Sequence, residues 1–258
     1  MNILEKIIAH KAREVAKRKS EVPEQELQNG RYFSRQALSL RKSLLDDRKT
    51  GIIAEYKRRS PSKGIINARD SVEAVTMAYT AYGASGISIL TDHEFFGGSL
   101  DDLISARDNG IPLLRKDFMI DEYQITEAKA FGADVILLIA ACLSPLRVKE
   151  LAQKARELGL EVLLELHDES ELGHICEAVD LVGVNNRNLK TFEVDLEHSV
   201  RLSEKIGNDL VKVAESGIND VDNISYLKAH GFRGFLIGEY FMKQKSPMEA
   251  FKNFSYSL

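Results

Sequence analysis

The chain has 258 residues, 44% of them hydrophobic and 29% charged, with a formal net charge of −4. This length suits two small domains or one large α/β barrel, and the charge argues against nucleic acid as a partner. Its two cysteines, Cys142 and Cys176, exclude a disulfide framework, and no apolar run approaches the roughly 18 residues of a membrane span. Charges near the N-terminus are unlike a signal peptide, so we expect a cytoplasmic protein.

The first segment predicts an amphipathic helix over residues 1–20, because Ile3, Ile7 and Val15 lie near one helical face with Lys and Arg on the other. A further helix is expected around Ser34–Leu45. We interpret residues 1–48 as a helical extension of one domain that spans residues 1–258.

From Gly51 onward, apolar runs rich in Ile, Val and Leu recur, with starts about 20–35 residues apart, as in repeated strand–helix units. They are Ile52–Glu55, Ile87–Leu90, Ile111–Leu114, Asp134–Ile139, Glu161–Leu166, Leu181–Val184, Leu210–Ala214 and Phe235–Ile237. Most runs are continuous rather than alternating, which is typical of parallel strands covered on both faces.

Helix-capping patterns lie between the runs. Ser99 with Asp102, and Asp168 with Glu171, predict capping boxes. Ser-Pro pairs predict a cap followed by proline in the first turn; they are Ser144-Pro145 and Ser246-Pro247. Eight runs alternating with helices, without a linker, predict an α/β fold, a closed (β/α)8 barrel. A doubly wound sheet is the alternative, but no G-x-G-x-x-G follows a run.

Polar residues close most runs, and in such a barrel the strand ends and the loops after them hold the active site. They are Glu55 and Lys57, Thr91 and Asp92, Arg115 to Asp117, Glu165, Asn185 to Asn188, Glu215 to Gly217, and Gly238 with Glu239. Buried carboxylates need compensation, and Lys57, Lys116 and Arg187 can supply it. Lysines and carboxylates around one mouth can act as acid and base.

Three further features suggest a substrate with a phosphate and a planar ring. Ser216-Gly217 and Gly238-Glu239 offer unhindered backbone N–H groups where barrel phosphates commonly bind, provided that the Glu239 side chain turns away. An apolar wall is predicted from Phe96, Phe118 and Leu137. The basic stretch Arg58–Gly64 is expected to be a mobile loop that closes over the site.

Five motifs in order make the pattern specific. They are IAEYKRRSPS at Ile53–Ser62, Leu90-Thr91-Asp92 with Phe96-Gly-Gly-Ser99, LRKDF at Leu114–Phe118, GVNNRNL at Gly183–Leu189 and AESGI at Ala214–Ile218. This set resembles the indole-3-glycerol-phosphate synthase family of tryptophan biosynthesis over essentially the whole chain, including the helical extension. The resemblance implies ring closure of 1-(2-carboxyphenylamino)-1-deoxyribulose 5-phosphate with loss of carbon dioxide and water, and it implies no metal or cofactor.

The resemblance also implies roles for individual residues. Lys116 is expected to be the general acid for ring closure and Glu165 the base or acid of later proton transfers. Lys57 is expected to pair with the substrate carboxylate or phosphate and to act in dehydration. Residues expected to orient the substrate and hold the lysines charged are Glu55, Asn185, Arg187 and Glu215. Phosphate contacts are expected from Lys57, Ser216, Gly217, Gly238 and the Glu239 amide. Residues expected to bind the rest of the substrate are Ser60, Pro61, Phe96, Phe118 and Leu137.

Three other functions stay open from the residues alone. Lys116 suits a Schiff-base aldolase, and the phosphate loops suit a sugar-phosphate isomerase; a barrel kept as a docking or ligand-sensing module is the non-enzyme alternative. Arg115 and Asp117 are interpreted as structural. His167 is expected to cap a helix or support the site rather than react. The sequence does not indicate whether other tryptophan-pathway enzymes associate with the chain.

Overall fold

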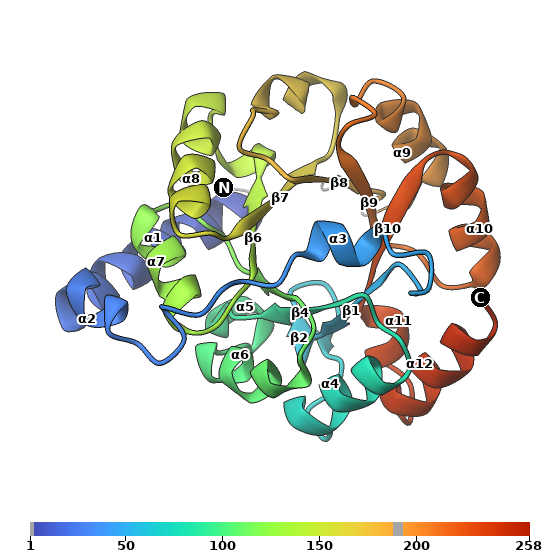
Figure 1. Ribbon diagram of the computed structural model, residues 1–258, viewed down its shortest axis with the longest axis horizontal. Helices are drawn as coiled ribbons and strands as arrows, with labels where there is room; N and C mark the ends of the chain where they lie inside the picture. Colours follow the sequence, from blue (N-terminus) through green and yellow to red (C-terminus); the bar gives the residue numbers. More distant parts are fainter. Residues whose placement is uncertain (1–2, 188–192) are drawn as a thin grey trace.

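The structure is a computed structural model that describes residues 3–187 and 193–258. Within these residues, eight parallel strands close into a barrel in the order β1-β10-β9-β8-β7-β6-β5-β4 (Figure 1). The barrel strands are β1 (Ile52–Tyr56), β4 (Gly86–Leu90), β5 (Leu113–Lys116), β6 (Val135–Ile139), β7 (Glu161–Leu166), β8 (Leu181–Asn185), β9 (Val211–Glu215) and β10 (Phe232–Ile237). Each predicted run overlaps one strand, so the predicted (β/α)8 barrel is confirmed.

The third predicted run is displaced along the chain. The sequence suggested Ile111–Leu114, whereas the strand β5 ends at Lys116, which lies opposite Leu90 of β4. Pro112 has no N–H to donate, which is consistent with a strand that begins after it. Because Lys116 belongs to the strand itself, the barrel wall fixes the position of its backbone.

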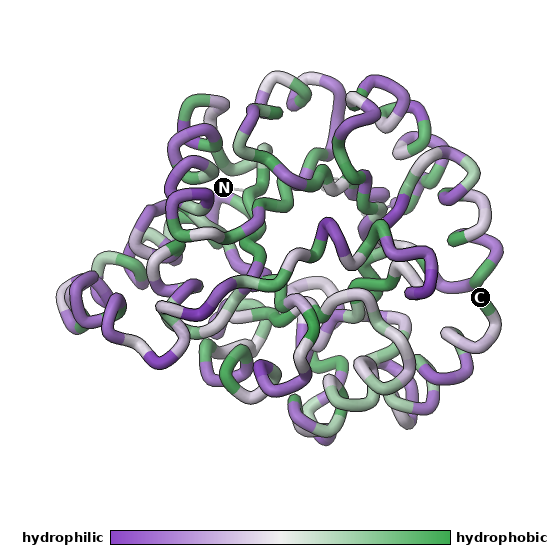
Figure 2. Tube along the Cα trace, in the orientation of Figure 1, coloured by the Kyte–Doolittle hydropathy of each residue, from purple (hydrophilic) through white to green (hydrophobic). Residues whose placement is uncertain are grey.

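Helices surround the barrel (Figure 1). They are α4 (Val72–Ala81), α5 (His93–Phe96), α6 (Leu100–Ala106), α7 (Glu122–Ala130), α8 (Pro145–Glu157), α9 (Leu196–Ser203), α10 (Val221–Ala229), α11 (Glu239–Met242) and α12 (Pro247–Tyr256), with 3-10 helices η1 (Arg107–Asn109), η2 (Ala140–Cys142) and η3 (Glu169–His174). Hydrophobic residues concentrate along the barrel wall, whereas the outer helices are mixed (Figure 2). One apolar cluster, which includes Ile87, Val162 and Phe251, fills the layer between strands and helices. A second cluster, which includes Ile53 and Leu137, fills the barrel interior.

Capping side chains set where helices begin. Ser99 and Asp102 form the predicted capping box at the start of α6. The predicted Ser-Pro starts are also confirmed, at Ser144 and Ser246. The capping box predicted at Asp168 and Glu171 is wrong in part. Asp168 caps the 3-10 helix η3, but Glu171 accepts the backbone N–H of His167 rather than that of Asp168.

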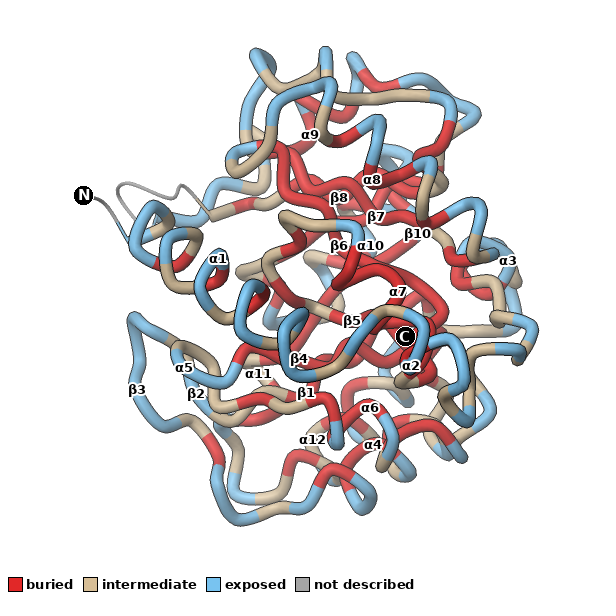
Figure 3. The backbone as a smooth tube through the Cα atoms, turned by 90° about the vertical axis from the view of Figure 1, so that its left-hand side faces the viewer, coloured by how far each residue is buried: buried red, intermediate tan, exposed pale blue. Residues whose placement is uncertain are grey.

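In the described part of the chain, three helices precede the barrel: α1 (Ile3–Glu21), α2 (Glu24–Gln28) and α3 (Leu40–Leu44). The α1 helix lies at the end of the barrel that carries the short strands β2 (Arg59–Ser60) and β3 (Gly64–Ile65), and α3 lies at the other end (Figure 3). Leu40 and Leu44 join the interior cluster, so α3 packs against the amino-terminal end of the barrel. The helix predicted around Ser34–Leu45 is shorter than expected, because Ser39 caps it by accepting the backbone N–H of Lys42.

Candidate active site

The carboxyl ends of the strands bring the predicted charged residues to one rim. Glu55 lies on β1, Lys116 ends β5, Glu165 lies on β7, Asn185 ends β8 and Glu215 ends β9. Parallel strands of one barrel all end on the same side, so residues far apart in the sequence meet there.

Lys116 lies between two carboxylates. Its Nζ is 2.6 Å from Oε2 of Glu215 and 3.4 Å from Oε2 of Glu165. Burial lowers the pKa of Lys116, but the charges of Glu215, Glu165 and Glu55 outweigh burial and raise the pKa above its ordinary value. Lys116 is therefore an ammonium ion at neutral pH, which suits a proton donor and does not suit a nucleophilic amine.

The two carboxylates differ in their surroundings. Oε1 of Glu165 accepts a 2.9 Å hydrogen bond from Asn185 and lies 3.1 Å from Nε2 of His167. Burial raises the pKa of Glu165, but Lys116 and His167 oppose burial and bring the pKa below its ordinary value. Oε1 of Glu215 is buried without a hydrogen-bond partner among the described residues, and burial raises the pKa of Glu215 to about 7, although Lys116 opposes the rise. Glu165 is therefore ionised at neutral pH, and Glu215 is the carboxyl group whose surroundings favour a bound proton.

Glu55 and Lys57 form the predicted pair at the end of β1. Nζ of Lys57 lies 2.8 Å from Oε1 of Glu55, and Ser88 donates a 3.4 Å hydrogen bond to Oε2. A Cβ on Gly238 would stand 2.5 Å from Oε1 of Glu55. The glycine therefore lets the backbone after β10 approach the pair, and it joins the Lys57 side of the rim to the predicted phosphate loops.

The loop after β9 has an unusual backbone. Ser216 and Gly217 have φ values of 69° and 72°, which is the left-handed region. The side chain of Asn186 donates a 2.6 Å hydrogen bond to the Ser216 carbonyl and so supports this turn. A Cβ on Gly217 would lie 2.2 Å from Cγ1 of Val194, so a side chain does not fit there.

Arg187 and Glu239 face each other beside these loops. Nη2 of Arg187 lies 3.8 Å from Oε2 of Glu239, so the glutamate side chain is directed to the arginine. The Arg187 backbone N–H donates a 3.0 Å hydrogen bond to Oδ1 of Asn185. Asn188, which the sequence places next in this loop, lies outside the described residues.

Three predicted apolar residues gather at the mouth of the barrel. The rings of Phe96 and Phe118 have centroids 6.1 Å apart and planes tilted by 36°. Phe118 packs on the interior cluster that contains Leu137. The two rings are only partly buried, so they provide an accessible apolar surface.

The stretch Arg58–Gly64 forms a short hairpin where the sequence predicts a loop. Strands β2 and β3 pair as an antiparallel hairpin, with Arg59 opposite Ile65. Arg58 forms an ion pair with Asp102 of α6. Ser60 is half-buried, whereas Pro61 is exposed at the turn of the hairpin.

The sequence reasoning missed a buried ion cluster next to Lys116. Nζ of Lys11, on α1, lies 2.9 Å from Asp92 and 2.9 Å from Asp117, and the lysine side chain is 0% exposed. Asp117 also pairs with Arg115 at 3.1 Å, which agrees with the structural interpretation of those two residues. The sequence feature that indicates this cluster is the position of Lys11 between Ile7 and Val15, on the buried face of α1.

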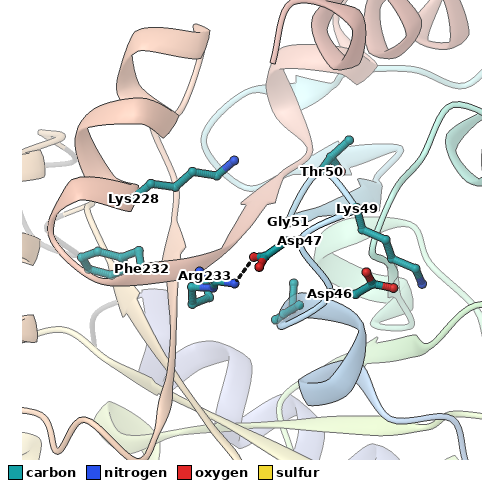
Figure 4. Close-up of a pocket in the computed structure, with 9 residues that line it drawn as sticks. Asp46, Asp47, Lys49, Thr50, Gly51, Lys228, Phe232 and Arg233 are labelled. Carbon is teal, nitrogen blue, oxygen red and sulfur yellow. Dashed lines mark hydrogen bonds and ion pairs between the residues drawn. The ribbon is translucent and has the colours of Figure 1, made fainter.

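A pocket also exists at the opposite end of the barrel (Figure 4). Gly51, just before β1, and residues at the start of β10 line it, and Arg233 pairs with Asp47 beside it. Barrel enzymes place their chemistry at the carboxyl ends of strands, so residues here support stability rather than catalysis.

Other kinds of site are not found in the part of the chain that the structure describes. No group of three or more His, Cys, Asp or Glu residues there has an arrangement that holds a metal ion. No helix there is both long enough and apolar enough to cross a membrane. Cys142 and Cys176 are both free thiols.

The closed barrel and its rim of lysines and carboxylates define a TIM-barrel enzyme with an acid–base site. The family model of indole-3-glycerol phosphate synthase matches residues 4–254. The chain therefore belongs to the indole-3-glycerol phosphate synthase family, an enzyme family of tryptophan biosynthesis. The family predicted from the motifs is confirmed, and the aldolase and isomerase alternatives are not favoured.

Proteins named indole-3-glycerol phosphate synthase resemble the chain over nearly its full length. The protein of Bacteroides thetaiotaomicron is 49% identical over 254 residues, covering 98% of this chain and 97% of that protein. Indole-3-glycerol phosphate synthase of Salinibacter ruber is 42% identical, covering 97% and 94%. The Acinetobacter baumannii protein is 41% identical, covering 96% and 94%.

Solved structures of other proteins share the fold at low identity. Tryptophan synthase subunit alpha of Legionella pneumophila has a TM-score of 0.61 at 13% identity, covering 84% of this chain and 94% of that chain. Thiamine phosphate pyrophosphorylase of Pyrococcus furiosus has a TM-score of 0.60 at 17% identity, covering 84% and 96%. These likenesses support the TIM-barrel fold and carry no further argument about function.

Proposed function

We propose that the chain converts 1-(2-carboxyphenylamino)-1-deoxyribulose 5-phosphate into indole-3-glycerol phosphate, carbon dioxide and water. The observation that carries this proposal is the Lys116 ammonium held at 2.6 Å and 3.4 Å by Glu215 and Glu165. Ring closure places developing negative charge on a ketone oxygen, and a fixed ammonium both stabilises that charge and protonates the oxygen.

The reaction divides into three steps. The aromatic carbon that bears the carboxylate attacks the ketone carbon, and Lys116 gives its proton to the ketone oxygen. The bond to the carboxylate then breaks, carbon dioxide leaves, and the electron pair restores the ring. The new hydroxyl finally takes a second proton from Lys116, which is reprotonated after the first step, and leaves as water, while Glu165 removes one proton from the ring that becomes indole. Every step is a proton transfer or the polar formation or cleavage of a bond, without a change in overall oxidation state, so we infer no requirement for a redox cofactor or a metal.

The remaining residues bind and orient the substrate in this proposal. Lys57, held by Glu55, pairs with the substrate carboxylate or phosphate and assists the dehydration. The phosphate lies against the backbone of Ser216, Gly217, Gly238 and Glu239, where the turn and the glycines permit close approach. Substrate orientation is assigned to Asn185, Arg187 and Glu215. The carboxyphenyl ring lies against Phe96, Phe118 and Leu137, with Ser60 and Pro61 reaching it if the hairpin moves inward.

A turnover assay tests the function. Purified protein with this substrate, and without added cofactor, is expected to release a product with indole fluorescence and one carbon dioxide per product. Binding without turnover would instead indicate a ligand-sensing module. Borohydride added during turnover is expected to leave Lys116 unlabelled, because a protonated lysine does not form an imine; covalent labelling at Lys116 would indicate an aldolase.

The two free cysteines support a reducing compartment, and we infer the cytoplasm as the site of this reaction.

A further inference from the structure

His167 lies between Glu165, the candidate base, and a second carboxylate, Glu171, which is nearer the surface. Its Nε2 lies 3.1 Å from Oε1 of Glu165, and its Nδ1 lies 3.8 Å from Oε2 of Glu171. The side chains of His167 and Glu171 are 10% and 12% exposed. Residues 168–170, which precede Glu171 on the same turn, are all exposed. The imidazole therefore stands between the closed rim and a segment in contact with solvent.

The backbone fixes this arrangement from both sides. The His167 N–H donates a 2.6 Å hydrogen bond to Oε2 of Glu171, so the carboxylate is held beside the ring. The His167 carbonyl lies 2.8 Å from Nε2 of His198 on α9. Asp168 adds a third carboxylate near the imidazole, on the solvent side. The two ring nitrogens of His167 face carboxylate oxygens of Glu165 and Glu171.

The proposed reaction consumes one proton in each turnover. The substrate carboxylate carries a negative charge, whereas carbon dioxide and water are neutral and the phosphate is unchanged. The substrate takes one proton at the ketone oxygen and a second at the leaving hydroxyl, and it returns only one, which Glu165 removes from the ring, so the rim ends each turnover one proton short. A group must carry a proton from solvent to the Lys116–Glu165 pair before the next turnover.

We propose that His167 is the relay residue that carries this proton from Glu171 and solvent to Glu165, and that Glu165 passes it to Lys116. The inference rests on the proposed function, because it follows from the proton balance of that reaction. The Nε2–H bond of the imidazolium breaks as an O–H bond forms on Glu165. The carboxyl group turns, its O–H bond breaks, and an N–H bond forms on Lys116. A half-turn of the ring brings the bare nitrogen to Glu171, where a solvent proton reloads it.

The surroundings of His167 keep its imidazole protonated. Burial lowers the pKa of His167, but Glu165 and Glu171 outweigh burial and raise the pKa to about 10. The ring is therefore an imidazolium at neutral pH. Once Lys116 has given up its proton, the charge that does most to lower the pKa of Glu165 is gone, so Glu165 accepts a proton more readily than in the resting site. His167 is not expected to touch the substrate, and it acts through Glu165.

The test compares proton supply in variants that keep the rest of the rim. His167→Ala is expected to lower kcat about a hundredfold with little change in KM, and added imidazole is expected to restore kcat in a saturable manner. His167→Gln, which keeps a polar side chain but carries no proton, is expected to lose kcat similarly and to serve if the alanine variant does not fold. Imidazole is expected to have no effect on the wild type or on His230→Ala, whose histidine is exposed at the end of α10.

The outcomes separate the relay from the function it depends on. Full kcat in His167→Gln, or a lowered kcat in His167→Ala that imidazole does not restore, would overturn the relay while leaving the proposed function intact. A wild-type protein that does not convert the substrate at all would overturn both. Lowered kcat with saturable rescue at unchanged KM would support the relay.

Discussion

Nζ of Lys11 lies 2.9 Å from Oδ1 of Asp117, the residue that directly follows Lys116. This contact fastens the first helix to the end of β5 at the point where the candidate general acid leaves the strand. Burial lowers the pKa of Lys11, but Asp117, Asp92 and Glu14 outweigh burial and raise it, so the lysine is charged. The helical extension therefore supports the backbone from which Lys116 projects.

Lys11→Met tests this connection. Removal of the ammonium leaves Asp92 and Asp117 with reduced compensation in a buried site, so we expect a loss of about 3–5 kcal/mol in the free energy of unfolding, together with a lower kcat. Denaturant unfolding and turnover measure the two effects. The matched control is Lys17→Met on the same helix, whose pair with Glu21 is exposed and is expected to contribute less than about 1 kcal/mol. Equal losses in the two variants would contradict the proposed support.

The proposed phosphate loop predicts a selective effect of Gly217→Ala. The residue has a φ of 72°, and the new Cβ would meet Val194 at 2.2 Å, so the turn has to shift. We expect KM to rise about tenfold, equivalent to about 1.4 kcal/mol of substrate binding. Gly159→Ala introduces a side chain at a similar φ of 69° with nothing within 4 Å, and its KM is expected to stay unchanged. The same rise in KM for both variants would argue against a phosphate site at Gly217.

The aromatic wall predicts different roles for two adjacent phenylalanines. Phe96 packs near Phe118, whereas the ring of Phe95 lies edge-on to His10 of α1 at 5.6 Å. Phe96→Ala is expected to raise KM about tenfold, because the carboxyphenyl ring loses an apolar partner worth roughly 1–2 kcal/mol. Phe95→Ala is expected to lower stability and leave KM near its original value. Steady-state kinetics and thermal unfolding of both variants check this, and a larger KM effect at Phe95 would refute the assignment.

His167 makes stability depend on pH in a defined direction. Its pKa rises from 6.5 to about 10 on folding, so the folded state binds its proton more tightly than the unfolded chain does. The resulting stabilisation is fully present below about pH 6.5 and is lost as pH rises toward 10. The wild type is therefore expected to exceed His167→Gln in unfolding free energy by more at pH 6 than at pH 10. A difference that is constant across this range would show that the imidazole does not carry the expected charge.

The sequence could predict the rim because parallel barrel strands end on the same side. That rule alone placed Lys116, Glu165 and Glu215 together, and the two-residue spacing placed Glu55 beside Lys57. It could not identify Lys11, since a lysine on an apolar helix face becomes meaningful only once Asp92 and Asp117 are known to converge on it. Prediction from the local sequence pattern also failed where a tertiary contact decides the structure.

Two segments illustrate that failure. Arg58–Gly64 contains Ser, Pro and Gly and so predicts a loop, but a hairpin forms there, and Arg58 pairs with Asp102. The pattern at Asp168 predicts an ordinary capping box, whereas Glu171 bonds to the His167 backbone and faces its ring. The position of His167 between two carboxylates therefore depends on how the turn after β7 folds, which no spacing rule supplies.

The measurement that tests the central claim most directly is cofactor-free turnover of the wild type and Lys116→Ala, combined with substrate affinity of the variant. We predict that the wild type releases the indole product and that Lys116→Ala loses kcat by at least about a hundredfold while its affinity changes by only a few-fold, since the ammonium acts on charge that develops in the transition state. An equal loss in kcat and affinity, or a wild type without turnover, would contradict it.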